Sequence, residues 1–241
     1  MYIDQIIRQP KNPTARVWRY LDLPKFIYLL DKRKLYFARA DRFEDQHEGA
    51  TPLEQKEWEL QRKTDTCHSL EEFRRRQREW SFVSCWSCSE HESHALWRLF
   101  CGPKHGVAIF TQYRELSALG NANPNLDSKV GLVDYGREDA MPPNTLFPFF
   151  RKRKAFAYEE EARWVMNIYG CTDVRDESGK LSPPRLHLEK PLDLKTFIEG
   201  IRIHPEADAA YQEVLRSVIQ KFAPELIDRV GPSEMSKPPV F

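Results

Sequence analysis

The chain has 241 residues, of which 41% are hydrophobic and 30% are charged, and its formal net charge is +1. This length suits one large domain or two small ones, and the composition excludes a disordered chain. The near-neutral charge argues against tight, nonspecific binding to nucleic acid.

The apolar segments and the cysteines indicate a cytoplasmic protein. No run of about 18 apolar residues is present, so we expect no membrane-spanning helix and no membrane partner. Residues 1–19 lack the apolar stretch of a secretory signal. The five cysteines are odd in number, which favours a reducing compartment over a disulfide scaffold. We therefore expect a bacterial-type cytoplasm, and the sequence leaves the oligomeric state open.

Apolar patterns typical of strands recur along the chain. They lie at residues 15–20, 35–39, 81–89, 106–111, 129–135, 162–168, 197–203 and 226–230. The segment 106–111 is apolar throughout, which predicts a strand covered on both faces.

Helical patterns and helix start signals lie between these strands. Helices are predicted from Pro24, over 52–79 with a break at 64–69, over 90–101, over 149–156, and from Pro205 to Phe222. Ser89 and Glu92 have the spacing of a capping box before the third of these. The last has an apolar stripe that includes Tyr211, Val214 and Val218.

The order of these elements predicts an α+β fold. Strands and helices do not alternate regularly, so a purely doubly wound sheet is not expected. We expect a mixed, mostly antiparallel sheet with flanking helices in one domain over residues 15–230. An N-terminal arm, 1–14, would precede it, and a Pro-rich tail, 231–241, would follow it.

The strongest candidate site is the segment from Tyr158 to Trp164. If it is extended, Glu159, Glu161 and Arg163 share one face. Such charges are costly to bury without a purpose. A carboxylate there could hold a sugar hydroxyl and stabilise an oxocarbenium-like centre. The alternative is a solvated edge strand with an ordinary ion pair.

A second candidate lies in the strand over 81–89. Alternation places Cys85, Ser87 and Ser89 on one face, and Trp86 and Cys88 on the other. The two thiols would then not converge, so we expect structural cysteines and no metal. His91 and His94 continue the three-residue spacing, so a zinc site is the alternative. The face with the two serines could bind a ribose or a phosphate, although a plain core strand is the commoner explanation.

The first strand supplies a third candidate, Arg19, beside Tyr20. Arginine is well suited to bidentate contact with phosphate. The alternative is a surface arginine flanked by core aromatic residues.

Five segments, in this order, resemble an uncharacterised and mainly bacterial family, domain of unknown function 2971. They are Trp18-Arg19-Tyr20; Lys34 to Phe37 leading to Phe43-Glu44-Asp45 and Glu48-Gly49; Cys85 to Glu90; Leu96-Trp97 with His105-Gly106-Val107; and Phe156 to Arg163. The chain departs from the family at Glu44-Asp45-Gln46, where Asn-Asp-Pro is usual, and at Ser87 to Glu90, where Phe-Ser-Glu is more common. This resemblance implies no activity.

The order of an early arginine, a serine-rich strand and a later Glu-x-Glu is similar to that of ADP-ribosyltransferases. The resemblance implies that Arg19 grips NAD, that Ser87 or Ser89 shapes the nicotinamide pocket, and that Glu159 with Glu161 holds the ribose as the glycosidic bond breaks. Aromatic side chains would stack on a base. The candidates for stacking are Tyr20, Trp86 and Trp97, and Arg163 would help to bind the substrate.

Three functions follow as hypotheses. The first is an ADP-ribosyltransferase-like or NAD-glycohydrolase-like enzyme with NAD as substrate, acting as a toxin or an antiphage effector on a protein or nucleic-acid target that the sequence does not identify. The second is a non-catalytic binding or regulatory module, in which Glu159 and Arg163 would form a closed ion pair with no open pocket beside them. The third is a metal-dependent nuclease or phosphoesterase that uses Asp45, Glu48 and Glu161.

Overall fold

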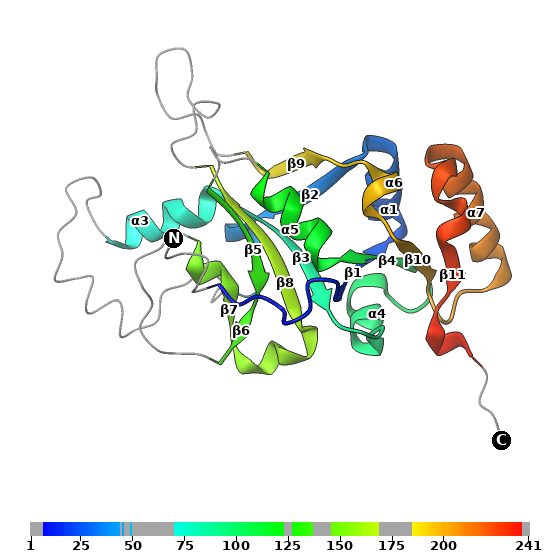
Figure 1. Ribbon diagram of the computed structural model, residues 1–241, viewed down its shortest axis with the longest axis horizontal. Coiled ribbons are helices and arrows are strands. Elements are labelled where there is room, and N and C mark those ends of the chain that lie inside the picture. Colours follow the sequence, from blue (N-terminus) through cyan, green and yellow to red (C-terminus); the bar gives the residue numbers. More distant parts are fainter. Residues whose placement is uncertain are drawn as a thin grey trace, which may run out of the picture.

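The computed structural model describes residues 7–43, 45, 49, 70–122, 127–136, 146–168 and 185–237. Helices pack against one nine-stranded sheet whose pairs are antiparallel except for β10 and β11. The predicted α+β fold with a mixed, mostly antiparallel sheet is therefore confirmed (Figure 1). Among the described residues, no helix combines the length and apolar character that crossing a membrane requires.

The strands of the main sheet are β1 (Arg16–Asp22), β2 (Lys34–Arg39), β3 (Ser81–Cys88), β4 (Gly106–Gln112), β5 (Asp127–Leu132), β8 (Glu161–Asn167), β9 (His187–Pro191), β10 (Gly200–Ile203) and β11 (Val230–Pro232). Their order is β11-β10-β4-β1-β3-β2-β9, and β8 joins β3 to β5. A small second sheet pairs β6 (Asp134–Tyr135) with β7 (Arg151–Lys152).

The sheet splits where β1 leaves β3, and this split positions the candidate site. β1 pairs with β3 only at Val17 and Trp18, whereas it pairs with β4 along its whole length. The same β3 strand pairs with β2 through Phe82 and Val83. The β3 residues between these two contacts, 84–86, therefore border a gap between β1 and β2.

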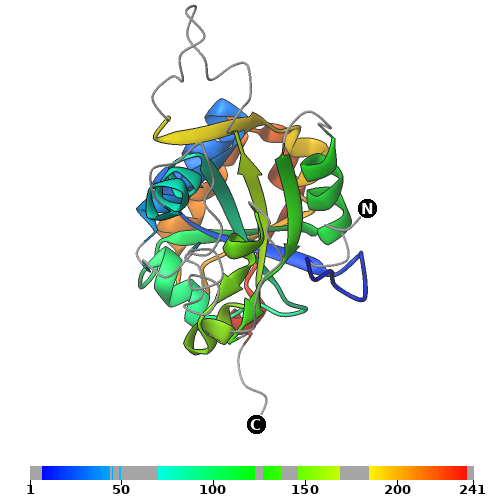
Figure 2. The ribbon, with the colours of Figure 1, turned by 90° about the vertical axis from the view of Figure 1, so that its left-hand side faces the viewer.

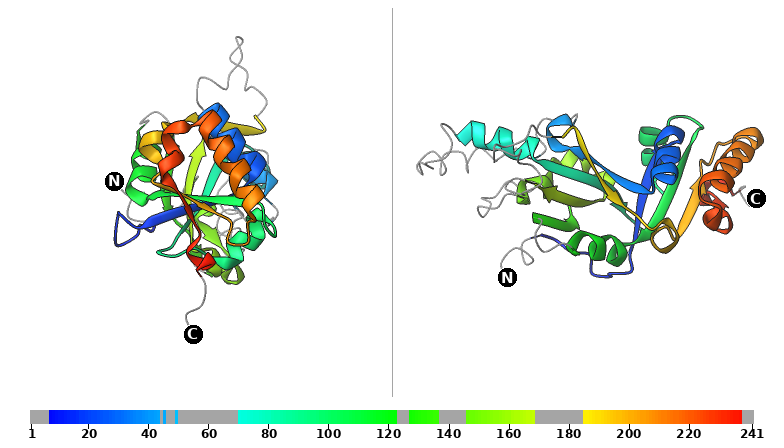
Figure 3. Two further views of the ribbon diagram at one scale, coloured as in Figure 1. Left: turned by 90° about the vertical axis from the view of Figure 1, so that its right-hand side faces the viewer. Right: turned by 90° about the horizontal axis from the view of Figure 1, so that it is seen from above.

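The α-helices are α1 (Leu23–Lys32), α3 (Leu70–Glu79), α4 (His94–Cys101), α5 (Tyr113–Asn121), α6 (Leu194–Phe197) and α7 (Ala209–Phe222). Short 3-10 helices are η1 (Ala40–Arg42), η2 (Phe147–Phe150), η3 (Lys154–Glu159), η5 (Pro224–Arg229) and η6 (Glu234–Ser236). Helix α1 begins where Pro24 stands in its first turn and Asp22 accepts a hydrogen bond from the backbone of Lys25. It lies beside α7 at one end of the molecule (Figure 3), and α5 lies beside β5 (Figure 2).

The alternation of β1 divides the core between the two faces of the sheet. Val17 and Leu21 belong to the largest apolar cluster, together with Trp86 from β3. Trp18 and Tyr20 point to the opposite face, where α4 covers them. Period-two burial of this kind is what the sequence predicts for strands.

Two predicted helices differ in the structure. The helix expected over 90–101 begins only at His94, because Ser93 is its N-cap and accepts from the backbone of Leu96. The helix expected over 149–156 is wrong. Strand β7 interrupts this segment because its backbone pairs with β6, so a distant strand overrides local helix propensity.

The C-terminal third also differs in detail. The predicted strand over 197–203 is shortened to β10 because Asp193 caps the one-turn helix α6. The segment predicted as a strand over 226–230 is mostly η5, with β11 following. Val214 of α7 is 51% exposed rather than part of the buried stripe, which runs through Tyr211, Leu215 and Ile219 instead. Strand β9 and helix α5 lie where the sequence pattern predicts neither.

Both ends of the described chain contact the sheet. Arg8 accepts a hydrogen bond through its carbonyl from Leu132 of β5 (2.8 Å), and Ile7 is buried. This crossing needs the glycine at 131, because a Cβ there would collide with the Ile7 side chain. At the other end, most of β11 and all of η6 lie within the residues predicted as a tail.

Candidate functional site

A cavity of about 250 Å³ lies at the split between β1 and β3. Its walls come from β1, β2, β3 and α4 and from the chain around η3 and β8. The lining residues are Trp18, Arg19, Tyr20, Leu21, Lys25, Tyr36, Ala38, Phe43, Val83, Cys85, Trp86, Ser87, Leu96, Phe100, Glu159 and Glu161. The cavity thus brings together side chains from five separate stretches of the sequence.

Arg19 provides a half-buried cation on the wall of this cavity. Its Nη1 donates to Ser84 Oγ (2.7 Å) and its Nη2 to the Tyr36 carbonyl (3.1 Å), across the gap between β1 and its neighbours. Its guanidinium also lies 5.6 Å from the centre of the Trp86 ring. Within the described part of the chain, no carboxylate forms an ion pair with it. Burial lowers the pKa of Arg19 to about 10, so it stays charged at neutral pH.

Two buried carboxylates lie on the same cavity and belong to a network of four charges. Arg163 Nη2 contacts Glu161 Oε2 at 2.7 Å, and Lys152 Nζ contacts Glu159 Oε2 at 2.6 Å. Lys152 also lies 3.6 Å from Glu161 Oε2. Arg163 is fully buried and donates a second hydrogen bond to the Phe149 carbonyl (2.7 Å). The formal charges of these four side chains cancel.

The environments of the two carboxyl groups shift their pKa values in opposite directions. Burial raises the pKa of Glu159, and this effect outweighs the stabilising contact with Lys152. Burial also opposes ionisation of Glu161, but Arg163, Lys152 and a hydrogen bond from Cys85 hold its pKa below the usual value. Pairs of carboxyl groups that are separated in this way are typical of sites that divide acid–base roles.

Aromatic side chains form much of the remaining wall. Tyr20 and Trp86 are buried, and the Tyr20 hydroxyl accepts a hydrogen bond from the backbone of Ser93 (2.8 Å). Burial raises the pKa of Tyr20, so its hydroxyl stays protonated. Tyr36 and Phe100 remain exposed. The cavity therefore combines flat apolar surfaces with charged groups.

The structure gathers most of the predicted site residues in this cavity. Those that line it are Arg19, Tyr20, Trp86, Ser87, Glu159 and Glu161. Glu161 is the cross-strand partner of Ser87, and Ser87 is the partner of Trp18. This register explains why the serine strand, the early arginine strand and the Glu-x-Glu segment meet at one place.

Three predicted residues lie elsewhere. Arg163 is behind Glu161, without exposed surface. Ser89 follows β3, outside the cavity, where its carbonyl accepts from Trp18 Nε1 (2.9 Å). Trp97 is fully buried, packs edge-on against Tyr20, and donates to Glu92 Oε2 (2.9 Å). Its ring therefore offers no face on which a ligand could stack, because core residues surround it.

Sequence reasoning missed Lys25, Tyr36, Phe100 and Lys152. Lys25, Tyr36 and Phe100 line the cavity. Lys152 does not line it, but forms an ion pair with Glu159, which does. None has a local signal: Lys152, for example, lies in a segment that the sequence predicts as a helix. Only strand pairing brings it to Glu159.

The residues considered for metal binding do not assemble among the described residues. Asp45 is paired with Arg153 (3.1 Å), and Glu48 lies outside the described residues. Cys85 and Cys88 pack against different apolar clusters, as alternation predicts. Across the described ranges, no three potential metal ligands gather.

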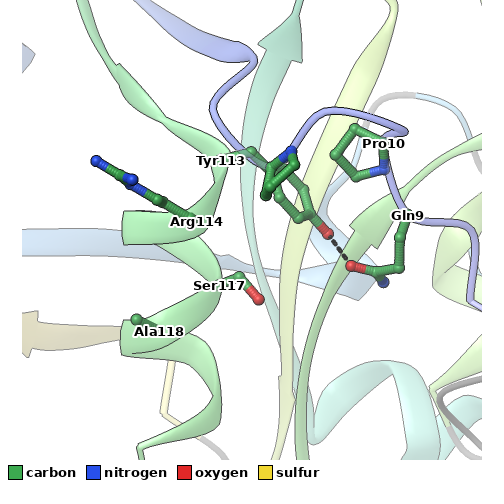
Figure 4. A pocket seen from close by; sticks show the side chains of 7 residues that line it. Gln9, Pro10, Tyr113, Arg114, Ser117 and Ala118 are labelled. Atoms are coloured by element: carbon green, nitrogen blue, oxygen red, sulfur yellow. Dashed lines mark hydrogen bonds between the residues drawn. The ribbon is translucent and has the colours of Figure 1, made fainter.

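A second, open pocket of about 380 Å³ lies between the N-terminal segment and α5 (Figure 4). Tyr113 donates a hydrogen bond to Gln9 Oε1 (2.7 Å) within it. Arg114 is the charged residue of its lining, and the other residues are Pro10, Pro13, Ser117 and Ala118. Its described lining contains no carboxylate and none of the predicted site residues, so the cavity at the split is the stronger candidate.

The chain matches no protein family, no curated protein and no solved structure in three separate comparisons. Its resemblances to domain of unknown function 2971 and to ADP-ribosyltransferases stay predictions.

Proposed function

We propose that the cavity at the split binds NAD and that the protein cleaves the bond between nicotinamide and ribose, by transfer of ADP-ribose or by hydrolysis. One observation carries the proposal. A single cavity joins Arg19, a cation without a carboxylate partner among the described residues, to the ionised Glu161 through aromatic walls. A ligand with an anionic group, flat rings and a developing positive charge would complement the cavity. The anionic group would match Arg19, the rings would match the aromatic walls, and the positive charge would match Glu161.

The chemistry follows from the charges. When the glycosidic bond breaks, its electron pair stays on the nicotinamide nitrogen, and positive charge develops on the ribose. The ionised Glu161 would stabilise that charge. Water or an acceptor hydroxyl then attacks C1′ and releases a proton. Glu159, whose raised pKa makes its carboxylate the stronger base, would receive this proton.

The size of the cavity limits how NAD would sit. Small-molecule sites commonly occupy about 300–1,000 Å³, whereas this cavity measures about 250 Å³. It would therefore hold the nicotinamide ribose half with a phosphate at Arg19, while the adenosine half lies at its mouth.

The test is incubation of purified wild type and Glu161→Gln with NAD, with nicotinamide release followed by chromatography and protein mass by spectrometry. We expect Glu161→Gln to reduce release by roughly 10²–10³-fold, the usual effect of removing one stabilising group from a reacting centre. Glu160→Gln is the matched control, because this neighbouring carboxylate is exposed and does not line the cavity. A mass gain on a target would indicate transfer rather than hydrolysis.

Two results would contradict the proposal. The first is equal nicotinamide release by wild type and Glu161→Gln. The second is the absence of NAD binding to wild type in calorimetry. A role as a toxin or antiphage effector stays a prediction.

A second candidate function is a nucleotide-binding module without catalysis. The closed network favours it, because Lys152 and Arg163 already neutralise Glu159 and Glu161. Two features differ from those expected for such a module. Arg163 pairs with Glu161 rather than with Glu159, and a cavity lies beside the two carboxylates. This candidate predicts that wild type binds NAD without releasing nicotinamide, and that Arg19→Met weakens binding.

A further inference from the structure

Two aromatic residues of the cavity differ from the others in their exposure. Tyr36 is 40% exposed and Phe100 is 46% exposed, whereas Trp18, Tyr20 and Trp86 are at most 7% exposed. Exposed residues of a cavity lining lie where it meets the solvent, so Tyr36 and Phe100 mark its mouth. They come from different elements, β2 and α4.

The core does not require either ring. Tyr36 alternates along β2 with the buried Leu35 and Phe37, so its side chain leaves the core. Phe100 follows Leu96 of α4 by four residues and so lies on the same side of the helix, yet its side chain is exposed while that of Leu96 is buried. Large exposed rings beside a cavity are typical of surfaces that bind flat ligands.

Tyr36 is also held in place. Its ring stacks on His187 with centroids 5.0 Å apart and planes 20° apart. His187 thereby covers one face of the Tyr36 ring, and the residue as a whole keeps 40% of its surface exposed. The Tyr36 carbonyl accepts from Arg19 Nη2 (3.1 Å). The residue that carries this ring therefore contacts the cation through its backbone, and both residues line the same cavity.

We infer that Tyr36 and Phe100 bind the adenine ring of NAD by stacking at the mouth of the cavity. This rests on the proposed function, which places the nicotinamide ribose near Glu161 inside and leaves the adenosine half outside. Neither residue takes part in bond cleavage. They determine affinity and the preference for a ligand that carries a base.

The experiment is calorimetric titration of wild type, Phe100→Ala and Tyr36→Ala with NAD, AMP and ribose 5-phosphate. Removing one stacking ring should weaken NAD and AMP binding by about five- to hundredfold. Ribose 5-phosphate has no base, so its affinity should not change. Tyr36→Phe keeps a ring and should bind like wild type.

The chain offers matched controls. Leu99 adjoins Phe100 on α4 and is 55% exposed, and Tyr28 on α1 is 37% exposed, but neither lines the cavity. Leu99→Ala and Tyr28→Ala should leave all three affinities unchanged.

The possible failures are distinguishable. Wild type that binds NAD, together with unchanged AMP and NAD affinity in Phe100→Ala and Tyr36→Ala, would overturn this inference and leave the proposed function standing. Equal losses for ribose 5-phosphate would overturn it as well, since they would indicate a distorted site. No NAD binding to wild type would overturn both.

Discussion

Arg163 illustrates how a single buried residue supports the site. The sequence predicts that Glu159, Glu161 and Arg163 share the face of one strand, but β8 begins only at Glu161. Glu160 before it has a left-handed backbone, with φ of 44°. Glu159 therefore lies in η3, and Lys152 rather than Arg163 is its partner. Arg163 holds Glu161, whose pKa it lowers.

Arg163→Met should lower the free energy of unfolding by about 3–5 kcal/mol, the usual loss when one partner of a buried ion pair is removed. Among the described residues, Glu161 would then keep the more distant Lys152 as its cationic partner, together with the hydrogen bond from Cys85. Urea unfolding at pH 7 measures the change. The double variant Glu161→Gln/Arg163→Met should lose less than the sum of the two single variants. Additive losses would mean that the pair is not coupled.

At the scale of elements, α4 depends on a contact that the sequence does not reveal. Ser89 and Glu92 have capping-box spacing, yet the Glu92 carboxylate binds Trp97 Nε1 and Ser233 Oγ. Ser93 caps the helix instead, and its Oγ accepts from Leu96 N (3.4 Å). The capping box predicted from Ser89 and Glu92 does not form here, because Ser233, from a distant segment, binds the Glu92 carboxylate instead.

Ser93→Ala should therefore lower the free energy of unfolding by about 0.5–2 kcal/mol, the usual effect of losing an N-cap. Ser89→Ala is the matched control. Ser89 is half-buried and does not cap the helix, so this change should lower the free energy of unfolding by less than about 0.5 kcal/mol. Thermal and urea unfolding compare the two. A larger loss of stability in Ser89→Ala than in Ser93→Ala would mean that Ser89 caps the helix, as the capping-box spacing in the sequence predicts.

At the scale of the whole molecule, the C-terminal segment fastens the helix that forms one wall of the cavity. Strand β11 extends the sheet beside β10, and the chain then turns onto Glu92. The backbone of Glu234 donates to Glu92 Oε1 (2.9 Å). Ser233 and Glu234 thus bind the carboxylate of Glu92, from which they are separated by 141 and 142 residues in the sequence.

Glu92→Ala should lower the free energy of unfolding by about 1.5–3 kcal/mol, because Trp97 and Ser233 would lose a charged acceptor. Glu90→Ala removes a nearby, exposed carboxylate and should have little effect. Urea unfolding measures both, and limited proteolysis should detect a loosened C-terminal segment in Glu92→Ala alone. Equal stability of the two variants would contradict this role.

The sequence by itself determined the fold class and the main strands. It also identified several residues that line the cavity, since most of the predicted site residues lie there. Alternation along β1, β3 and β8 reports which side chains share a face, because period and burial are local properties of a strand. Ser87 and Glu161 could be identified in this way, whereas Arg19 was identified from its residue type.

Only the tertiary structure decided what those residues face. The split between β1 and β3, the burial of Trp97 and the pairing of Lys152 with Glu159 depend on contacts between distant segments. Local propensity carries no information about such contacts, and it is outweighed where they form. The cavity exists because β1 leaves β3 after two residue pairs, and no pattern within either strand indicates that departure.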